Sequence, residues 1–249
     1  MLDADVHRAA FDRVSAAFST EIDRHDPQDA IAWASWPTVA ALTAHLGGIH
    51  LWAGEIVRRG GRVDRASLPP APVNSDREWY DSCREKLRET WAASTPDTAC
   101  WVIGDRPDGT ARFWMRRMVY ETTKHLIDLR AAGGDRWTVA PELSAAEYAD
   151  GIDELFEVFL ARSRATLDPL PAPLHLDATD IDRRWTLTPD WQVHADETGD
   201  EGTVISASAG ELALFVWERG DPLDQRDRYA IAGESAVVRA YAASPVHPG

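Results

Sequence analysis

Cysteine is scarce in this chain, and long apolar runs are missing from it. Only Cys83 and Cys100 occur among 249 residues, which is too few for a disulfide framework. No apolar run approaches the length that a bilayer-spanning helix needs, and the charged N-terminus lacks the unbroken apolar stretch of a signal peptide. We therefore expect a cytoplasmic protein with no membrane partner.

Positive charge is also in short supply. Lys and Arg total 26 against 41 Asp and Glu, which gives a formal net charge of −15. Attraction to phosphate backbones or to anionic lipid requires a positive surface. The charge balance therefore predicts no nucleic-acid partner. The length is enough to bury a substantial core and suits one large domain or two ordinary ones.

Helical periodicity dominates the first part of the chain. Apolar residues at helical spacing predict a first helix over about 4–25, and a second helix follows Ser35, its expected N-cap, and ends at Gly60. Ser75 and Glu78 form a capping-box pattern that opens a third helix. A fourth is expected over 112–132. Four helices with a proline-rich crossover between the second and third fit a four-helix bundle.

The pattern changes after this region. Ser144 opens a capping box for a fifth helix, which we expect to buttress the bundle. Alternating apolar residues then predict short strands near 174–176, within 183–197 and at 203–206, followed by a helix that opens at Ser208. We therefore predict an N-terminal helical domain, 1–165, and a smaller α+β domain, 166–249.

The fourth helix carries ionisable residues on its apolar stripe. The stripe steps by four, three, four and three residues through Trp114, Met118, Glu121, His125 and Asp128. Burying a carboxylate beside an imidazole is costly unless something pairs with them. A divalent metal bound by Glu121 and His125 would remove that cost. The alternative is a buried ion pair without a metal.

A second E-x-x-x-H pair, Glu21 and His25, serves as an internal control. Glu21 lies beside the apolar stripe of its helix, and His25 comes just before Asp26 and Pro27, where the helix should stop. The helix dipole explains a histidine in a last turn. Spacing alone is therefore weak evidence, and the position on a buried stripe favours the later pair.

His45 is the third candidate ligand. It lies at the edge of the core face of the second helix, from which its ring can reach the bundle interior. Two histidines and a carboxylate with open positions form a recognised catalytic set for zinc or another divalent ion. The alternative for His45 is a core histidine that is hydrogen-bonded to a carbonyl or hydroxyl group.

Four segments carry a family resemblance: WPTVAALTAHLGGIH, FWMRRMVYETTKHLIDLRAA, YADGIDELFEVFL and AGELALFVWERGDPL. With them the chain resembles the mycothiol-dependent maleylpyruvate isomerase family, whose N-terminal domain is a DinB-like metal-binding bundle. The resemblance implies that His45, Glu121 and His125 bind a metal, usually zinc, and that mycothiol is the thiol cosubstrate. It also implies that Asp128 supports a ligand from behind, with a salt bridge to an arginine as the alternative.

The expected function follows from these residues. A metal-bound thiol would be a thiolate nucleophile at neutral pH, so we expect a thiol-dependent cis–trans isomerase or S-transferase that acts on an anionic electrophile. Arg219 is the candidate catalytic and cosubstrate-binding cation, with a helix-terminus role as its alternative. The alternatives are a metal-dependent hydrolase and a non-catalytic bundle that binds metal or small molecules in a stress response. We expect a monomer or homodimer.

Overall fold

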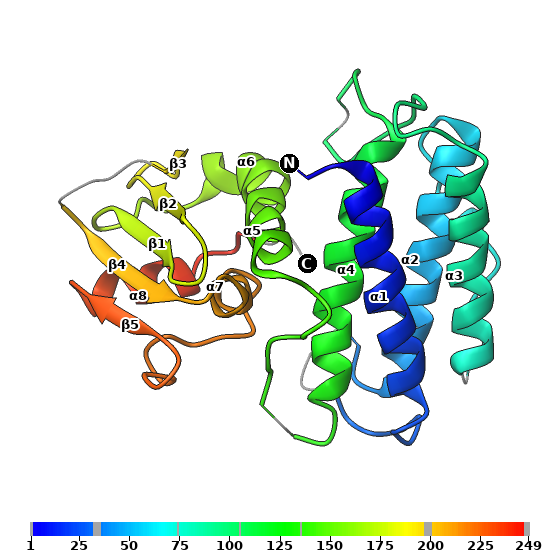
Figure 1. Ribbon diagram of the computed structural model, residues 1–249, viewed down its shortest axis with the longest axis horizontal. Coiled ribbons are helices and arrows are strands. Elements are labelled where there is room, and N and C mark those ends of the chain that lie inside the picture. The colour runs from blue at the N-terminus through cyan, green and yellow to red at the C-terminus, as the bar shows by residue number, and fades with distance from the viewer. Residues whose placement is uncertain are drawn as a thin grey trace. The chain divides into compact units, whose positions relative to one another are not determined.

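Two compact units make up the chain (Figure 1). The computed structural model describes residues 2–31, 36–73, 75–104, 106–134, 136–196 and 201–246. The first unit is Leu2–Glu142 and the second begins at Leu143. Among the described residues, none of the helices combines the length and the apolar character that spanning a bilayer requires.

The first unit is the predicted four-helix bundle. Its long helices are α1 (Ala4–Ile22), α2 (Val39–Arg59), α3 (Arg77–Ala92) and α4 (Ala111–Arg130). Helix α1 packs on α4, and α2 packs on both α3 and α4. The loop between α2 and α3 contains a short 3₁₀ turn, η1 (Arg65–Ser67).

Local hydrogen bonds set the ends of these helices. The Thr38 hydroxyl accepts from the Ala41 amide and caps α2, whereas Ser35, the expected cap, lies outside the described residues. Gly60 ends α2 with a φ of 71°, a left-handed conformation that costs glycine little. The cap of α3 is Asp76, which accepts from the Trp79 amide at 2.9 Å, so the prediction of a Ser75 cap is wrong by one residue.

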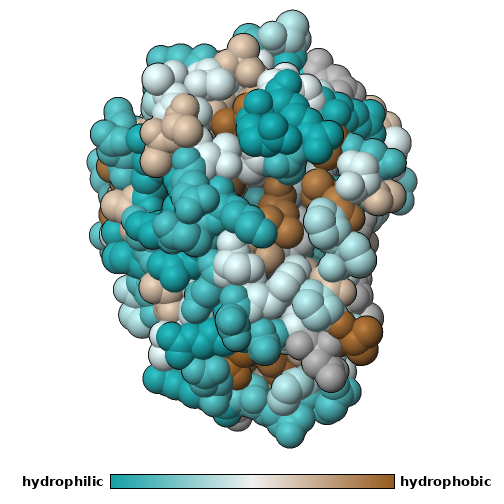
Figure 2. All heavy atoms as spheres, turned by 90° about the vertical axis from the view of Figure 1, so that its right-hand side faces the viewer, coloured by the Kyte–Doolittle hydropathy of each residue, from teal (hydrophilic) through white to brown (hydrophobic). Residues whose placement is uncertain are grey.

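Apolar side chains from every long helix fill the bundle core. The fully buried ones include Phe11, Val14 and Phe18 of α1, Leu42 and Leu46 of α2, Leu87 of α3, and Trp114 and Met118 of α4. The α3 side of the bundle is mostly hydrophilic on its surface, with small separate apolar spots (Figure 2). This division agrees with the amphipathic patterns from which the helices were predicted.

The second unit begins with a helical segment that changes its winding. The predicted capping box at Ser144 and Glu147 is present and opens α5 (Ala145–Glu154). The chain then continues as a π-helix over Leu155–Leu160 and as α6 (Ala161–Ser163). Helix α5 packs against α7 (Ala209–Val216). The fifth helix, which was expected to buttress the bundle, therefore belongs to the C-terminal unit.

The described strands of this unit form one mixed sheet. They are β1 (Leu174–Ala178), β2 (Arg183–Leu187), β3 (Val193–Ala195), β4 (Thr203–Ala207) and β5 (Ala230–Ala232), in the order β3-β2-β1-β4-β5. β1 and β4 are parallel and the other neighbours are antiparallel. Helix α8 (Ser235–Ala242) contacts β4. The predicted fold class, a helical bundle followed by a smaller α+β domain, is confirmed.

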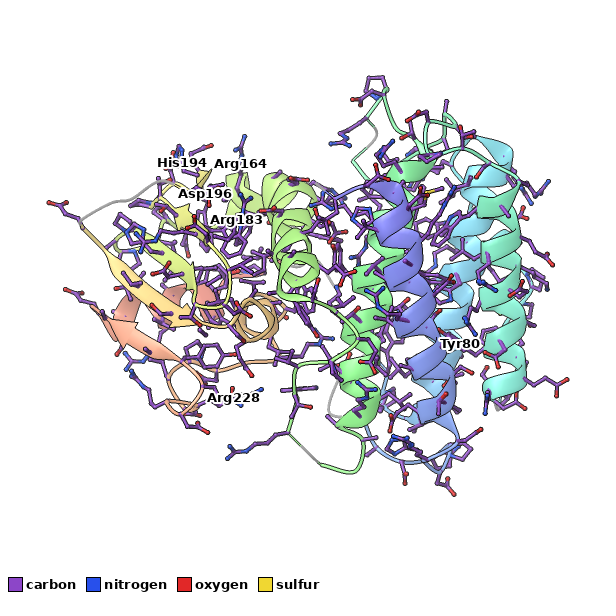
Figure 3. The ribbon with its side chains drawn as sticks, in the orientation of Figure 1. Tyr80, Arg164, Arg183, His194, Asp196 and Arg228 are labelled. Atoms are coloured by element: carbon purple, nitrogen blue, oxygen red, sulfur yellow. The ribbon has the colours of Figure 1, made fainter. Side chains whose placement is uncertain are left out.

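An ion-pair network ties the sheet to α5. Arg183 donates to Asp196 at 2.7 Å and to Asp153 of α5 at 2.9 Å (Figure 3). The Trp185 indole also donates to Asp153, at 2.7 Å. These contacts anchor α5 within the C-terminal unit. The boundary between the units therefore lies between Glu142 and Leu143, earlier in the chain than the expected boundary after residue 165.

Candidate metal centre

Three side chains from two helices of the bundle converge at one point. Glu121 and His125 lie one turn apart on α4, and His45 reaches them from α2. The imidazole Nε2 of His45 is 3.3 Å from Glu121 Oε1, and that of His125 is 3.4 Å from the same oxygen. One donor atom from each residue lies within 4.8 Å of the other two.

The site lies almost completely inside the bundle. The side chains of His45, Glu121 and His125 are 7%, 11% and 6% exposed. The Trp36 indole stacks on the His45 ring, with 3.7 Å between ring centroids. The imidazoles of His45 and His125 meet edge to face. The packing of α2 on α4 thus fixes both rings before any ligand arrives.

Asp128 contacts the Nδ1 side of the His125 ring, whereas Glu121 faces Nε2. Its carboxylate is 3.1 Å from Nδ1 of His125, one turn further along α4, and it is completely buried. A proton on Nδ1, donated to this carboxylate, leaves Nε2 as the acceptor nitrogen that faces Glu121. The arrangement of a carboxylate behind a histidine is typical of metal sites.

The two oxygens of Glu121 have different neighbours. Oε1 faces both imidazoles, whereas Oε2 accepts from Arg117 and lies 3.7 Å from the Lys124 ammonium. Burial alone would raise the pKa of the Glu121 carboxyl, but the charges of Arg117 and Lys124 hold it well below its usual value. Glu121 is therefore a carboxylate at neutral pH.

The two histidines differ in their affinity for protons. Burial lowers the pKa of His45 to about 4, so its ring is neutral at pH 7. Burial also acts against protonation of His125, but hydrogen bonds to Asp128 and Glu121 outweigh it and raise the pKa of that ring. A metal ion at this site would compete with the proton on His125.

The donor set fits a divalent transition metal. Nitrogen and oxygen ligands of tetrahedral zinc lie at about 2.0–2.2 Å from the ion, which separates neighbouring donors by roughly 3.3–3.6 Å. The separations of 3.3 and 3.4 Å agree with this spacing. In addition, the buried Nδ1 of His45 has no hydrogen-bond partner among the described residues. That nitrogen can carry the ring proton and leave Nε2 free.

The internal control behaves differently. His25 lies 3.6 Å from Glu21, whose other oxygen accepts from Arg24 and Arg130, but among the described side chains this pair belongs to no group of three donors that could share an ion. Within the described part of the chain, His45, Glu121 and His125 form the one group of three or more His, Cys, Asp or Glu side chains placed to share an ion. The E-x-x-x-H spacing alone therefore does not make a site.

Comparison with known proteins agrees with this architecture. A family model described as "Mycothiol maleylpyruvate isomerase N-terminal domain" matches residues 7–130, the span that holds all three candidate ligands. The chain belongs to the mycothiol maleylpyruvate isomerase family. A search of curated proteins returned no match.

Two solved structures share the fold of this family member. A crystal structure of the mycothiol-dependent maleylpyruvate isomerase superposes with a TM-score of 0.62 at 14% sequence identity, and 93% of each chain is covered. The structure of a histidine-to-alanine mutant gives a TM-score of 0.61 with the same identity and coverage. The likeness therefore extends over both units of the chain.

Arg219 belongs to the other unit of this family member. It follows α7 and is 5% exposed, and its guanidinium donates to the Trp217 carbonyl at 2.5 Å. That contact, at the end of a helix, agrees with the alternative interpretation of Arg219 as a helix-terminus residue. Its role toward a substrate or cosubstrate stays a prediction.

Sequence interpretation missed several neighbours of the site. Arg117 and Lys124 lie four residues before and three after Glu121, a spacing that predicts side-chain contact on a helix. They could have been found from α4 alone. The stack of Trp36 on His45 had no such signal, because Trp36 precedes the helix and its direction depends on the fold of the connecting segment.

Proposed function

We propose that this chain is a metal-dependent enzyme that uses a low-molecular-weight thiol, mycothiol, as its nucleophile. The convergence of His45, Glu121 and His125 on one point supports this proposal, because three protein ligands leave positions open for a cosubstrate. The proposed metal is zinc. The proposed reaction is cis–trans isomerisation of the maleylpyruvate type or S-transfer to a related electrophile.

When bound, zinc would lower the pKa of a coordinated thiol and make it a thiolate at neutral pH. Side chains of the bundle would hold the zinc ion. His45 offers a neutral nitrogen, His125 would offer one once a metal displaces its proton, and Glu121 offers one oxygen while Arg117 and Lys124 neutralise the other. Asp128 holds the Nδ1 proton of His125. The bundle core around them excludes water, which strengthens these electrostatic interactions.

The two proposed reactions share their first step. The thiolate sulfur adds to one carbon of an activated cis double bond, and the electron pair of that bond moves onto the activating group. Rotation about the resulting single bond and expulsion of the thiolate give the trans isomer. If the adduct instead takes a proton and leaves, the outcome is S-transfer. Arg219 stays a candidate for holding the anionic electrophile.

Zinc content and thiol dependence test the proposal. Purified protein should bind one zinc per chain, and His125→Ala should lose it. Glu21→Gln is the matched control, because it alters the other E-x-x-x-H pair and should keep the zinc. The zinc protein should then isomerise maleylpyruvate when mycothiol is added. Retention of full zinc occupancy by His125→Ala would contradict the proposed site.

The cosubstrate screen separates the competing functions. Mycothiol should raise the melting temperature of the zinc protein more than glutathione or cysteine does. Hydrolysis of an ester or amide without any thiol would favour a metal-dependent hydrolase. Zinc binding with neither activity would favour a non-catalytic bundle.

A further inference from the structure

A pocket of about 780 Å³ opens on the face of α2 that carries His45. One wall is the first half of that helix with Trp36, and the other is the loop after the helix, with Arg65 and the Pro69-Pro70 pair. Among the described residues that line the pocket, Arg65 is the one with a formal charge at neutral pH. The pocket thus presents one cation to a mostly apolar space beside a candidate metal ligand.

The loop that carries Arg65 is fixed in place. The Trp52 indole of α2 donates to the Val63 carbonyl at 2.8 Å, which ties the start of the loop to the helix. Asp64 caps the 3₁₀ turn by accepting from the Ala66 amide, and its carbonyl accepts from the Ser67 hydroxyl. The two prolines that follow restrict φ. The position of Arg65 is therefore set before a ligand binds.

The charge of Arg65 is not neutralised within the described structure. Its guanidinium lies over the Trp52 ring, 5.5 Å from the centroid. No carboxylate among the described residues pairs with it, although Asp and Glu outnumber Lys and Arg by 41 to 26. Stacking on an aromatic ring holds a guanidinium while leaving its N–H donors available.

We propose that this pocket is the carboxylate-binding subsite for the electrophile and that Arg65 determines its preference for anions. The planar donors of a guanidinium match the two oxygens of a carboxylate, and the apolar walls suit the short carbon chain of an unsaturated acid. A substrate held in this way would have its double bond on the side of His45. The inference rests on the proposed function, since it assigns the substrate contact of the same site.

Binding of maleate, a small cis dicarboxylate, tests the subsite. Titration calorimetry would compare maleate with its uncharged analogue maleamide, on zinc-loaded and on EDTA-treated protein. Arg65→Gln should weaken maleate binding by about tenfold in both forms, the loss of one charge-assisted contact. Arg65→Lys should restore part of the affinity. Maleamide should bind weakly and equally to every variant.

Arg62→Gln is the matched control. Arg62 lies in the same loop, is exposed, and stacks on a tryptophan in the same way, 5.6 Å from the Trp101 ring centroid, but it does not line the pocket. Its loss should change maleate binding by less than about twofold, because only the long-range charge is altered. Both variants remove one exposed positive charge, so a general effect of net charge would appear in both.

Three results would overturn the subsite: no measurable binding of maleate to the wild type, equal binding of maleate and maleamide, or equal losses in the Arg65 and Arg62 variants. Zinc content, measured on the same samples, tests the proposed function independently of the subsite. A protein that binds no zinc but discriminates maleate through Arg65 would refute the metal enzyme and retain the subsite.

Discussion

At the scale of single residues, the candidate site depends on how Glu121 divides its two oxygens. One oxygen is shared between Arg117 and Lys124, and the other faces the two imidazoles. A buried carboxylate with no partner would be protonated, and a protonated Glu121 would be a poor ligand. The two cations therefore keep the carboxylate of this candidate ligand charged, even inside an apolar bundle.

Asp128 gives the first prediction. Asp128→Asn keeps the shape of the side chain but removes the charge that holds the Nδ1 proton of His125. Loss of such a supporting carboxylate typically lowers metal affinity about 10- to 100-fold. We expect this loss in zinc titrations against a chromogenic chelator, with an unchanged circular dichroism spectrum. Wild-type zinc affinity in Asp128→Asn would mean that this carboxylate has a packing role alone.

His50 gives a prediction about acid stability. Its ring is completely buried, and its Nε2 lies 3.0 Å from the Thr122 hydroxyl oxygen. Its ring centroid is 5.5 Å from that of Tyr80, a residue of α3 that is labelled in Figure 3. Burial lowers the pKa of His50 from 6.5 to about 3. Between these values the unfolded chain binds a proton that the folded chain does not. Stability should therefore fall as the pH drops below 6.5, by up to about 1.4 kcal/mol per pH unit.

The variant His50→Gln isolates this contribution. Urea unfolding in EDTA at pH 7 and pH 5 should show a smaller loss of stability for the variant than for the wild type, by up to about 2 kcal/mol. His45 and His125 titrate in both proteins, so their effects cancel in the comparison. Equal losses would show that His50 takes up a proton in the folded state.

At the scale of elements, the close contact of α2 with α3 depends on a glycine. A Cβ built on Gly47 would lie 2.3 Å from the Trp79 ring, whereas one on Gly48 would meet nothing within 4 Å. Gly47→Ala must displace the indole and should destabilise the protein by about 1–3 kcal/mol. Gly48→Ala should stabilise it by up to about 1 kcal/mol, since alanine favours helix more than glycine does.

Chemical denaturation of the two alanine variants checks this difference directly. Both replace one glycine by alanine in the middle of α2, so the change in helix propensity is the same in the two variants. They differ in what the added methyl group meets: the Trp79 ring at position 47 and open space at position 48. Similar stability changes in the two variants would show that the Trp79 ring moves aside without cost. In that case the approach of α2 to α3 would not depend on glycine.

The same scale shows what the sequence could predict. The stripe of α4 predicted that Glu121 and His125 share one face, because a helix fixes which side chains lie together. The capping box at Ser144 and the N-cap at Ser208 are confirmed, since these caps need only local hydrogen bonds. The π-helix at Leu155–Leu160 could not be predicted. Its six residues complete little more than one turn, too short to show an apolar period of their own, and the segment differs from an α-helix in its i→i+5 hydrogen bonds.

At the scale of the whole molecule, the sequence interpretation and the structure differ most in where the boundary between the two units lies. The segment 145–163 is helical and amphipathic, and those properties cannot tell which core receives its apolar face. The elements that pack against this segment are distant from it in sequence. Helix α7 packs on α5, and Arg183 and Trp185 both bind Asp153 of α5. By contrast, the pairing of His45 with α4 could be predicted, because each helix carried a polar residue on an otherwise apolar face.

A metal shared by two helices of one unit should change protection within that unit. Zinc bound by His45 of α2 and by Glu121 and His125 of α4 would cross-link these helices and stabilise the folded bundle by mass action. Hydrogen exchange of the full chain should slow in α2 and α4 when zinc is added, whereas the strands β1 to β5, which supply no ligand, should exchange at unchanged rates. His45→Ala should remove the protection of α2. Equal slowing in the bundle and the sheet would show that the two units open together, and slowing confined to the sheet would place the metal elsewhere.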